Sequence, residues 1–183
     1  MNGPVFLTGL MGSGKTTVGQ MLAQRLGWQW IDLDHAIERR AGKKVAQIFS
    51  EQGEQVFRQM ESQELAFQAK ITQHVVSCGG GVVLAEKNRL LLKRNVTLYL
   101  AVSPELLAKR LKGIETKKRP LMRGRTPLKA LQRLQRERAH FYRSSATIVL
   151  RASPRPEQVA ERAFFRLRST LTPQGARVIL LKP

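Results

Sequence analysis

Residues 9–16 form the motif that most constrains this chain, Gly-Leu-Met-Gly-Ser-Gly-Lys-Thr. The apolar residues Val5, Phe6 and Leu7 precede it and an amphipathic segment follows it, so it joins a predicted strand to a predicted helix. Its glycines let backbone N–H groups surround an anion, and the start of the helix adds the positive end of its dipole. The motif therefore predicts an α/β fold that binds a nucleoside triphosphate.

Two side chains of this phosphate loop have predictable tasks. Lys15 is long enough to reach the β- and γ-phosphates, and the Thr16 hydroxyl is a suitable ligand for Mg²⁺. A nucleoside triphosphate is therefore the expected ligand and Mg²⁺ the expected cofactor. The loop residues that we expect to bind this nucleotide are Gly12, Ser13, Gly14, Lys15, Thr16 and Thr17.

Composition narrows the class of protein further. The chain has 183 residues, of which 42% are apolar, and this is enough for one packed core. A run of about 18 apolar residues does not occur, so we expect no membrane span. With no recognisable signal peptide and a single cysteine, Cys78, the expected location is the cytoplasm. We expect a monomer.

The charge of the chain is strongly one-sided, at +19 for 32 basic and 13 acidic residues. Residues 109–143 hold thirteen Lys and Arg but only two Glu. Such an excess suits ATP, an acidic substrate or non-specific contact with nucleic acid, but a solvated basic surface has the same composition. Because no helix-turn-helix, zinc-ligand spacing or aromatic RNA-binding motif accompanies it, charge alone does not choose between these interpretations.

Short apolar runs alternate with helical patterns along the chain, which predicts βαβ units and a parallel sheet. The apolar runs predict strands at 5–8, 30–32, 75–77, 96–102 and 147–150. The periodic segments predict helices at 15–26, 35–41, 45–49, 54–70, 88–94, 104–112, 127–142 and 156–171. We expect one domain over residues 1–171, with a mobile flap at 113–125 and a tail at 172–183.

Two carboxylates close the second predicted strand, in the run Asp32-Leu33-Asp34. Alternate residues of an extended segment point to the same side, so both carboxylates are expected to share one face. Because ligands of open parallel sheets bind beyond the carboxyl ends of the strands, Asp32 is a candidate for Mg²⁺ and Asp34 for a substrate hydroxyl. The alternative for Asp34 is that it caps the helix that follows.

Three glycines, Gly79, Gly80 and Gly81, follow the third predicted strand. A run without side chains is either a plain turn or a place where a ligand approaches the backbone. The sheet edge that it shares with the phosphate loop favours the ligand. Cys78 beside it is expected to be a small buried residue and not a nucleophile, and the three histidines show no metal-ligand spacing.

Two helical arginines are candidates for holding an anionic substrate. Arg138 falls on the apolar face of its helix, where a guanidinium needs an anionic ligand, a buried carboxylate or a path back to solvent. Arg58 lies opposite the apolar stripe of its helix, where Glu61 can orient it, although an ordinary surface charge would look the same. We assign that stripe to Val56, Met60 and Phe67.

The flap carries a candidate cation of its own, Arg119, which precedes Pro120 and Leu121. A cation on a closing flap can neutralise charge on a transferring phosphoryl group and exclude water. The alternative is one more basic loop residue, because position alone does not separate Arg119 from its neighbours.

Together these residues resemble the shikimate kinase family, small P-loop enzymes of aromatic amino acid biosynthesis, over about residues 4–168. The phosphate loop is shared by many proteins, and the specific part of the resemblance is the order of the other motifs. These are Asp32-Leu33-Asp34, Ile37-Glu38-Arg39-Arg40-Ala41-Gly42-Lys43, Ile48-Phe49, Gly53-Glu54-x-x-Phe57-Arg58-x-x-Glu61, Gly79-Gly80-Gly81, Arg119-Pro120-Leu121 and Arg138-x-x-x-Tyr142.

The resemblance implies a P-loop-type three-layer α/β sandwich with a five-stranded parallel sheet of order 2-3-1-4-5, a substrate-binding segment at about 33–62 and a lid at about 113–125. It implies phosphoryl transfer from ATP to the 3-hydroxyl of shikimate, which gives shikimate 3-phosphate and ADP. Asp34 would contact the ring hydroxyls and act as the base. Lys15 and the lid residue Arg119 would stabilise the transferring group, and Arg119 would also bind ATP.

Further roles follow from the same resemblance. Arg58 and Arg138 would grip the substrate carboxylate, with Gly80 as an additional contact. Thr16 and, through water, Asp32 would hold Mg²⁺. Either Arg110 or Arg155 would flank the adenine.

Two other functions remain open from the sequence. One is a related small-molecule kinase that acts on gluconate or a nucleoside monophosphate; the other is a basic nucleic-acid-binding protein on an ATP-binding fold. The pair Arg58 and Arg138, with the glycine run, favours a cyclic hydroxy acid over a nucleotide as the acceptor. The chain departs from the family in its net charge, its lid and its tail beyond Leu171, none of which touches the motif residues.

Overall fold

The computed structural model describes residues 3–111, 127–151 and 155–171. The predicted flap at 113–125, which includes Arg119, and the tail at 172–183 lie outside the described residues. No helix within these described ranges is long and apolar enough to cross a membrane.

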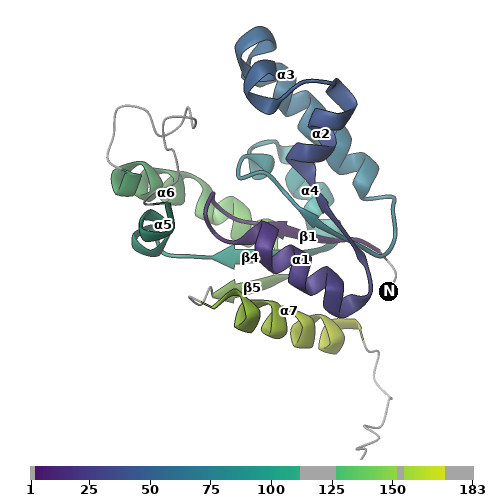
Figure 1. The fold of residues 1–183 in the computed structure, drawn as a ribbon. Helices are drawn as coiled ribbons and strands as arrows, with labels where there is room; N and C mark the ends of the chain where they lie inside the picture. The colour runs from purple at the N-terminus through teal and green to yellow at the C-terminus, as the bar shows by residue number, and fades with distance from the viewer. Residues whose placement is uncertain (1–2, 112–126, 152–154, 172–183) are drawn as a thin grey trace, which may run out of the picture.

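A parallel sheet of five strands forms the centre of the fold (Figure 1), in the order β2-β3-β1-β4-β5. This order confirms the prediction. The strands are β1 (Val5–Thr8), β2 (Gln29–Asp32), β3 (His74–Ser77), β4 (Val96–Ala101) and β5 (Ile148–Arg151). The helices are α1 (Lys15–Leu26), α2 (Leu33–Ala41), α3 (Val45–Gln68), the 3-10 turn η1 (Val82–Leu84), α4 (Glu86–Arg94), α5 (Pro104–Leu111), α6 (Pro127–Ser145) and α7 (Pro156–Leu171).

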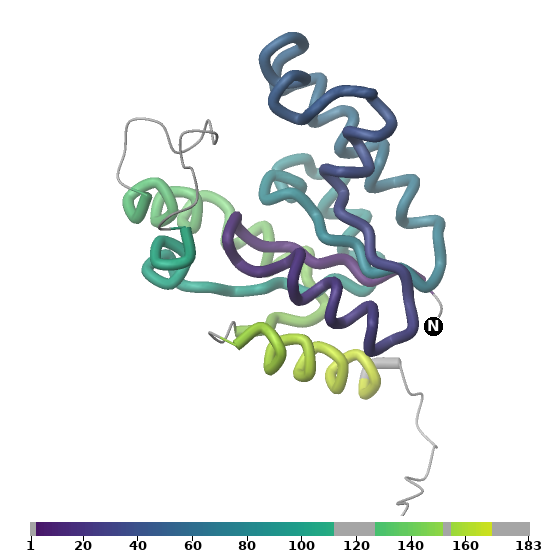
Figure 2. The backbone as a smooth tube through the Cα atoms, viewed as in Figure 1, coloured from purple at the N-terminus to yellow at the C-terminus, as the bar shows by residue number. Residues whose placement is uncertain are grey.

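Helices cover both faces of this sheet, which explains why its central strands are almost wholly apolar. In β1 the side chains of Val5 and Leu7 enter the core beneath α1 and α7, whereas Phe6 enters the core on the opposite face. Although α1 and α7 lie far apart in the sequence, they pack side by side (Figure 2). The alternation of one short strand thus supplies two hydrophobic cores.

Strand register brings the candidate site residues to one edge of the sheet. Leu7 of β1 and Asp32 of β2 both pair with Ser77 of β3, so the chain leaves all three strands at the same level. The phosphate loop, the start of α2 and the glycine run therefore begin next to one another, as ligands of open α/β sheets require.

Helix α3 differs from the two helices that the sequence predicted. The assignment is continuous from Val45 to Gln68, but the backbone leaves helical geometry at Gly53, with φ of 82° and ψ of 169°. The predicted break is therefore confirmed as a kink. A residue with positive φ interrupts the helical hydrogen bonds without ending the segment, and glycine adopts this conformation most easily.

The buried face of α3 also differs from the predicted stripe. Phe57, Glu61 and Leu65 are buried, whereas Phe67 is 47% exposed. The prediction of Phe67 as part of an inward stripe is therefore wrong. The buried positions after the kink are Phe57, Glu61, Ser62, Glu64, Leu65 and Gln68, and the polar residues among them conceal the apolar pattern.

Candidate active site

The phosphate loop connects β1 to α1 in a conformation that only its glycines accept easily. Gly9, Gly12 and Gly14 have φ values of 143°, 77° and 94°, which side-chain-bearing residues rarely adopt. A Cβ at Gly9 would also lie 2.9 Å from the carbonyl oxygen of Leu100 on β4. The loop is thus shaped by backbone geometry, and α1 begins directly after it at Lys15.

Two cationic side chains lie against the carbonyl groups of this loop. Lys15 Nζ donates to the carbonyls of Gly9 and Leu10, both at 3.0 Å. Arg110 of α5 donates from Nη1 to the carbonyls of Gly12 and Ser13 at 3.3 and 3.2 Å. The loop therefore has positive charge on two sides in addition to the dipole of α1, which suits a polyphosphate.

Asp32 and Asp34 occupy different positions from those predicted. Helix α2 already begins at Leu33, and Asp32 is its N-cap: its Oδ1 accepts from the backbone N–H groups of Asp34 at 3.0 Å and His35 at 3.3 Å. The predicted extended segment and the predicted capping role of Asp34 are both wrong. The Asp32 side chain satisfies the first free N–H groups of the helix, which leaves Asp34 in the first turn.

Arg58 of α3 is held by carboxylates on two sides. Its Nη1 donates to Glu61 Oε2 at 2.7 Å, and its Nη2 donates to Glu54 Oε1 at 3.0 Å. The Glu61 side chain is only 1% exposed, whereas that of Glu54 is 56% exposed. The predicted orientation of Arg58 by Glu61 is thus confirmed, and the guanidinium also lies over the ring of Phe57 at 5.2 Å.

The glycine run is the point where these charged groups converge. A Cβ at Gly79 would lie 2.9 Å from both Asp34 Oδ1 and Glu61 Oε1. A Cβ at Gly81 would overlap the guanidinium of Arg58. The absence of side chains at Gly79 and Gly81 is therefore what lets three charged groups from α2 and α3 reach the end of β3.

Arg138 reaches the same place from α6, on the far side of the run. Its side chain lies on the buried face of the helix, with the residue 7% exposed, and Nη1 donates to the carbonyl of Gly80 at 3.0 Å. Tyr142, one turn later, donates to the same carbonyl at 2.5 Å. The sequence predicted the inward position of Arg138 but treated Tyr142 only as part of an apolar face and a motif.

Burial shapes the charge states of the two acids. It raises the pKa of Asp34 above its usual 3.8, helped by the negative charge of Asp32 and opposed by Lys15 and Arg58. Burial likewise raises the pKa of Glu61, against the opposing effect of Arg58. A carboxyl whose pKa is raised in this way is a stronger base when ionised than an exposed one, which suits proton transfer.

Three polar atoms at the site are buried without a hydrogen-bond partner among the described residues, namely Asp34 Oδ1, Glu61 Oε1 and Arg138 Nε. Such atoms are costly unless something else satisfies them. Together they offer acceptors for hydroxyl groups on one side and a cationic donor for a carboxylate on the other. The site is therefore complementary to a small hydroxylated acid.

Among the other predicted residues, one is exposed, one lies outside the described residues and one is buried. Arg155 is exposed immediately before α7, and Arg119 lies outside the described residues. Cys78 is buried as expected, and burial raises the pKa of its thiol, so it is not a nucleophile. Within the part of the chain that the structure describes, no cluster of three His, Cys, Asp or Glu side chains could hold a metal ion.

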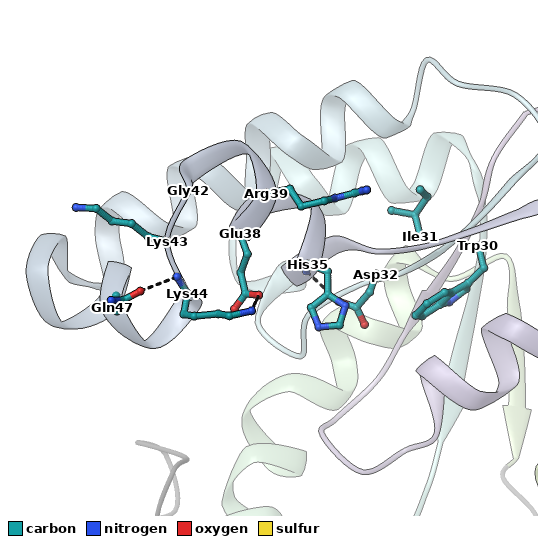
Figure 3. Close-up of a pocket in the computed structure, with 10 residues that line it drawn as sticks. All are labelled: Trp30, Ile31, Asp32, His35, Glu38, Arg39, Gly42, Lys43, Lys44 and Gln47. Carbon is teal, nitrogen blue, oxygen red and sulfur yellow. Dashed lines mark hydrogen bonds and ion pairs between the residues drawn. The ribbon is translucent and has the colours of Figure 1, made fainter.

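A cavity of about 700 Å³ opens beside α2 (Figure 3). Asp32, His35, Glu38 and Arg39 are among the residues that line it. At its rim Lys44 Nζ pairs with Glu38 Oε2 at 2.9 Å. Because charges at its rim pair with one another, we assign no chemistry to this cavity.

Comparisons with known proteins agree with this geometry. The family model described as shikimate kinase matches residues 11–168. A shikimate kinase of Synechococcus sp. (strain JA-3-3Ab) is 42% identical over 161 residues, which cover 87% of this chain and 85% of that protein. The structure of "Shikimate kinase from Acinetobacter baumannii in complex with shikimate" is similar with a TM-score of 0.87 at 32% identity, over 94% of this chain and 97% of that one.

A gluconokinase structure from Sinorhizobium meliloti 1021 is similar only in fold. Its TM-score is 0.57 at 16% identity, although the match covers 93% of this chain and 95% of that one. The comparison therefore does not favour the gluconate-type alternative.

The convergence at the glycine run can be tested through stability. In Gly81→Ala the new methyl group forces Arg58 away from Glu61, so we expect the free energy of unfolding to fall by about 1–3 kcal/mol. Urea denaturation measures this. The control is Gly3→Ala, because a Cβ there has nothing within 4 Å, and we expect a change of less than about 0.5 kcal/mol. Equal stability of Gly81→Ala and the parent chain would contradict the described position of Arg58.

Proposed function

Because the chain belongs to the shikimate kinase family and phosphorylates shikimate, we propose that the transfer takes place between its phosphate loop and its glycine run. The observation that supports this placement is the set of buried atoms Asp34 Oδ1, Glu61 Oε1 and Arg138 Nε, which lack partners among the described residues. A carboxylic acid with ring hydroxyls satisfies both kinds of group. The reaction gives shikimate 3-phosphate and ADP.

The acceptor is bound through its carboxylate and its hydroxyls. Arg138 and Arg58 hold the carboxylate from α6 and α3, since a planar guanidinium matches a carboxylate in geometry and charge. Gly80 contributes a backbone contact between them. Asp34 accepts hydrogen bonds from the ring hydroxyls, and these interactions fix which hydroxyl faces the phosphate loop.

The nucleotide is bound by the loop and the first turn of α1. Its phosphates interact with Gly12, Ser13, Gly14, Lys15, Thr16 and Thr17. Lys15 exchanges its contacts with the loop carbonyls for the β- and γ-phosphates. Arg110 or Arg155 flanks the adenine, and Arg119 contacts ATP from the lid.

The donors present fit Mg²⁺, because Thr16 supplies a hydroxyl and Asp32 a carboxylate, and hard oxygen ligands suit this ion. Thr16 would hold the ion directly and Asp32 would hold it through water. When bound, the ion neutralises charge on the β- and γ-phosphate oxygens. A site that depends mainly on phosphate oxygens and water needs no larger cluster of protein ligands.

The transfer step follows from these positions. Asp34 accepts the proton of the 3-hydroxyl while the oxygen of this hydroxyl forms a bond to the γ-phosphorus of ATP. The bond between that phosphorus and the β–γ bridging oxygen breaks, and the bridging oxygen leaves with ADP. Lys15 and Arg119 stabilise the charge on the transferring group. We assign this machinery to one domain over 1–171, with a substrate-binding segment at 33–62, a lid at 113–125 and a tail at 172–183, in a cytoplasmic monomer.

Replacing Arg138 tests the placement of the acceptor. In Arg138→Ala the shikimate carboxylate loses a buried cationic partner, so we expect KM for shikimate to rise about 10- to 100-fold while KM for ATP changes by less than about twofold. A coupled assay of ADP release, with gluconate and nucleoside monophosphates as alternative acceptors, measures both constants. The matched control is Arg136→Ala, an exposed arginine of the same helix, for which we expect no change. Equal increases in both KM values would mean that Arg138 is structural.

The pH dependence tests Asp34 as the base. A base works only when deprotonated, so its raised pKa places the acid limb of kcat/KM at a higher pH than an ordinary aspartate, whose pKa is 3.8, would give. In Asp34→Asn we expect kcat to fall about 10²–10⁴-fold and this limb to vanish from the residual activity. Glu137→Gln, an exposed change, serves as the control. A limb that persists in Asp34→Asn would assign the titration to another group.

A second candidate function is binding of nucleic acid, and a specific observation favours the outer face of α6. Four basic residues, Lys129, Arg133, Arg136 and Arg143, are exposed at intervals of four, three and seven residues, so they share one side of the helix. They span about 21 Å, with one acidic neighbour, Glu137, paired to Arg133 at 2.7 Å. Such a stripe suits a row of phosphates.

Salt-dependent binding of labelled RNA and DNA tests this stripe. We expect the triple change Lys129→Ala, Arg136→Ala and Arg143→Ala to reduce the salt slope by about 0.7–0.9 for each charge removed. The control removes three exposed charges elsewhere, by Arg25→Ala, Arg39→Ala and Lys70→Ala. Equal losses in the two variants would show that net charge alone, and not the stripe, attracts the nucleic acid.

A further inference from the structure

The carbonyl of Gly80 receives two donors from one helix. Arg138 donates from Nη1 at 3.0 Å, and the Tyr142 hydroxyl donates at 2.5 Å. The spacing of four residues places both side chains on the same face of α6, one turn apart. Two donors on one partly buried carbonyl fix the orientation of that peptide group more strictly than a turn of three glycines would by itself.

Gly80 also lies against the phosphate loop. A Cβ at this position would be 3.6 Å from both the carbonyl oxygen of Gly9 and the backbone nitrogen of Met11. The same residue thus contacts the loop that holds the phosphoryl donor and the helix that holds the acceptor carboxylate. Its position sets the separation of the two halves of the site.

Tyr142 is a rigid donor. It is fully buried, and its ring stacks on that of Tyr99 with centroids 5.0 Å apart and an interplanar angle of 15°. Burial raises the pKa of its phenol, so the hydroxyl keeps its proton. By contrast, the Tyr99 hydroxyl accepts a long hydrogen bond from Gln135 Nε2 at 3.5 Å.

We infer that Tyr142 is a positioning residue for the acceptor: its hydroxyl fixes the Gly80 carbonyl so that Arg138 can hold the shikimate carboxylate at the correct distance from the phosphate loop. The inference rests on the proposed binding of the carboxylate by Arg138. Without the hydroxyl, Arg138 is the remaining donor of this pair to the Gly80 carbonyl, and that carbonyl then competes with the substrate carboxylate for the guanidinium. Tyr142 itself touches neither substrate in this arrangement, so its effect passes through Gly80 and Arg138.

The pair Tyr142→Phe and Tyr99→Phe tests this inference, since each change removes one hydroxyl and keeps the stacked rings. For Tyr142→Phe we expect KM for shikimate to rise about five- to tenfold, the effect of one buried hydrogen bond, with KM for ATP within about twofold of the parent value. For Tyr99→Phe we expect both constants within about twofold. Steady-state kinetics of the full chain and calorimetric titration with shikimate measure the effect, and thermal melting verifies that both variants are folded.

The outcomes separate this inference from the proposed function. An unchanged KM for shikimate in Tyr142→Phe, with a raised one in Arg138→Ala, would overturn the role of Tyr142 alone. Unchanged values in both variants would overturn the placement of the carboxylate as well. Equal increases in Tyr142→Phe and Tyr99→Phe, with similar losses of melting temperature, would assign the effect to packing of the tyrosine stack and would also overturn the inference.

Discussion

The acceptor side of the site depends on one buried carboxylate, that of Glu61. Its side chain is 1% exposed, so its charge requires a partner inside the protein. Arg58 supplies that partner at 2.7 Å, and Glu54 holds the same guanidinium from the solvent side at 3.0 Å. If Arg58 moved away, the buried charge of Glu61 would have no partner. The two ion pairs therefore fix the orientation of the Arg58 side chain.

The shape of the glycine run follows from this ion pair. Because the Arg58 guanidinium occupies the space beside Gly81, and the carboxylates of Asp34 and Glu61 occupy the space beside Gly79, the run has no room for side chains there. At Gly80 the surroundings are backbone atoms of the phosphate loop and the Tyr142 hydroxyl. Each of the three glycines is thus restricted by its own neighbours: Gly79 by side chains of α2 and α3, Gly80 by the phosphate loop and Tyr142, and Gly81 by Arg58 of α3.

The parallel sheet and the phosphate loop could be predicted because they depend on local patterns and a specific motif, and the strand order followed from the resemblance to the family. Arg138 could also be placed, since a charge on an apolar helix face has few explanations. The position of Asp34 could not be predicted from the sequence pattern. Asp32 caps α2, so the helix begins at Leu33, within the segment that the pattern predicted as extended. Likewise, Glu61 three residues after Arg58 has the spacing of a surface ion pair, and only the packing of α3 shows that it is buried.

The cations of the site divide into two kinds by what they contact within the protein. Arg58 is bound to carboxylates, whereas Lys15 and Arg138 donate to the backbone carbonyls of Gly9, Leu10 and Gly80. A hydrogen bond between ions is stronger than one from a cation to a neutral carbonyl, so anionic substrates can displace the carbonyl contacts more readily than the ion pair. Arg58 is therefore a fixed partner for the acceptor carboxylate, and it keeps its ion pairs with Glu61 and Glu54. Lys15 and Arg138 are the groups whose contacts can be exchanged, one for the phosphates of the donor and the other for the carboxylate of the acceptor.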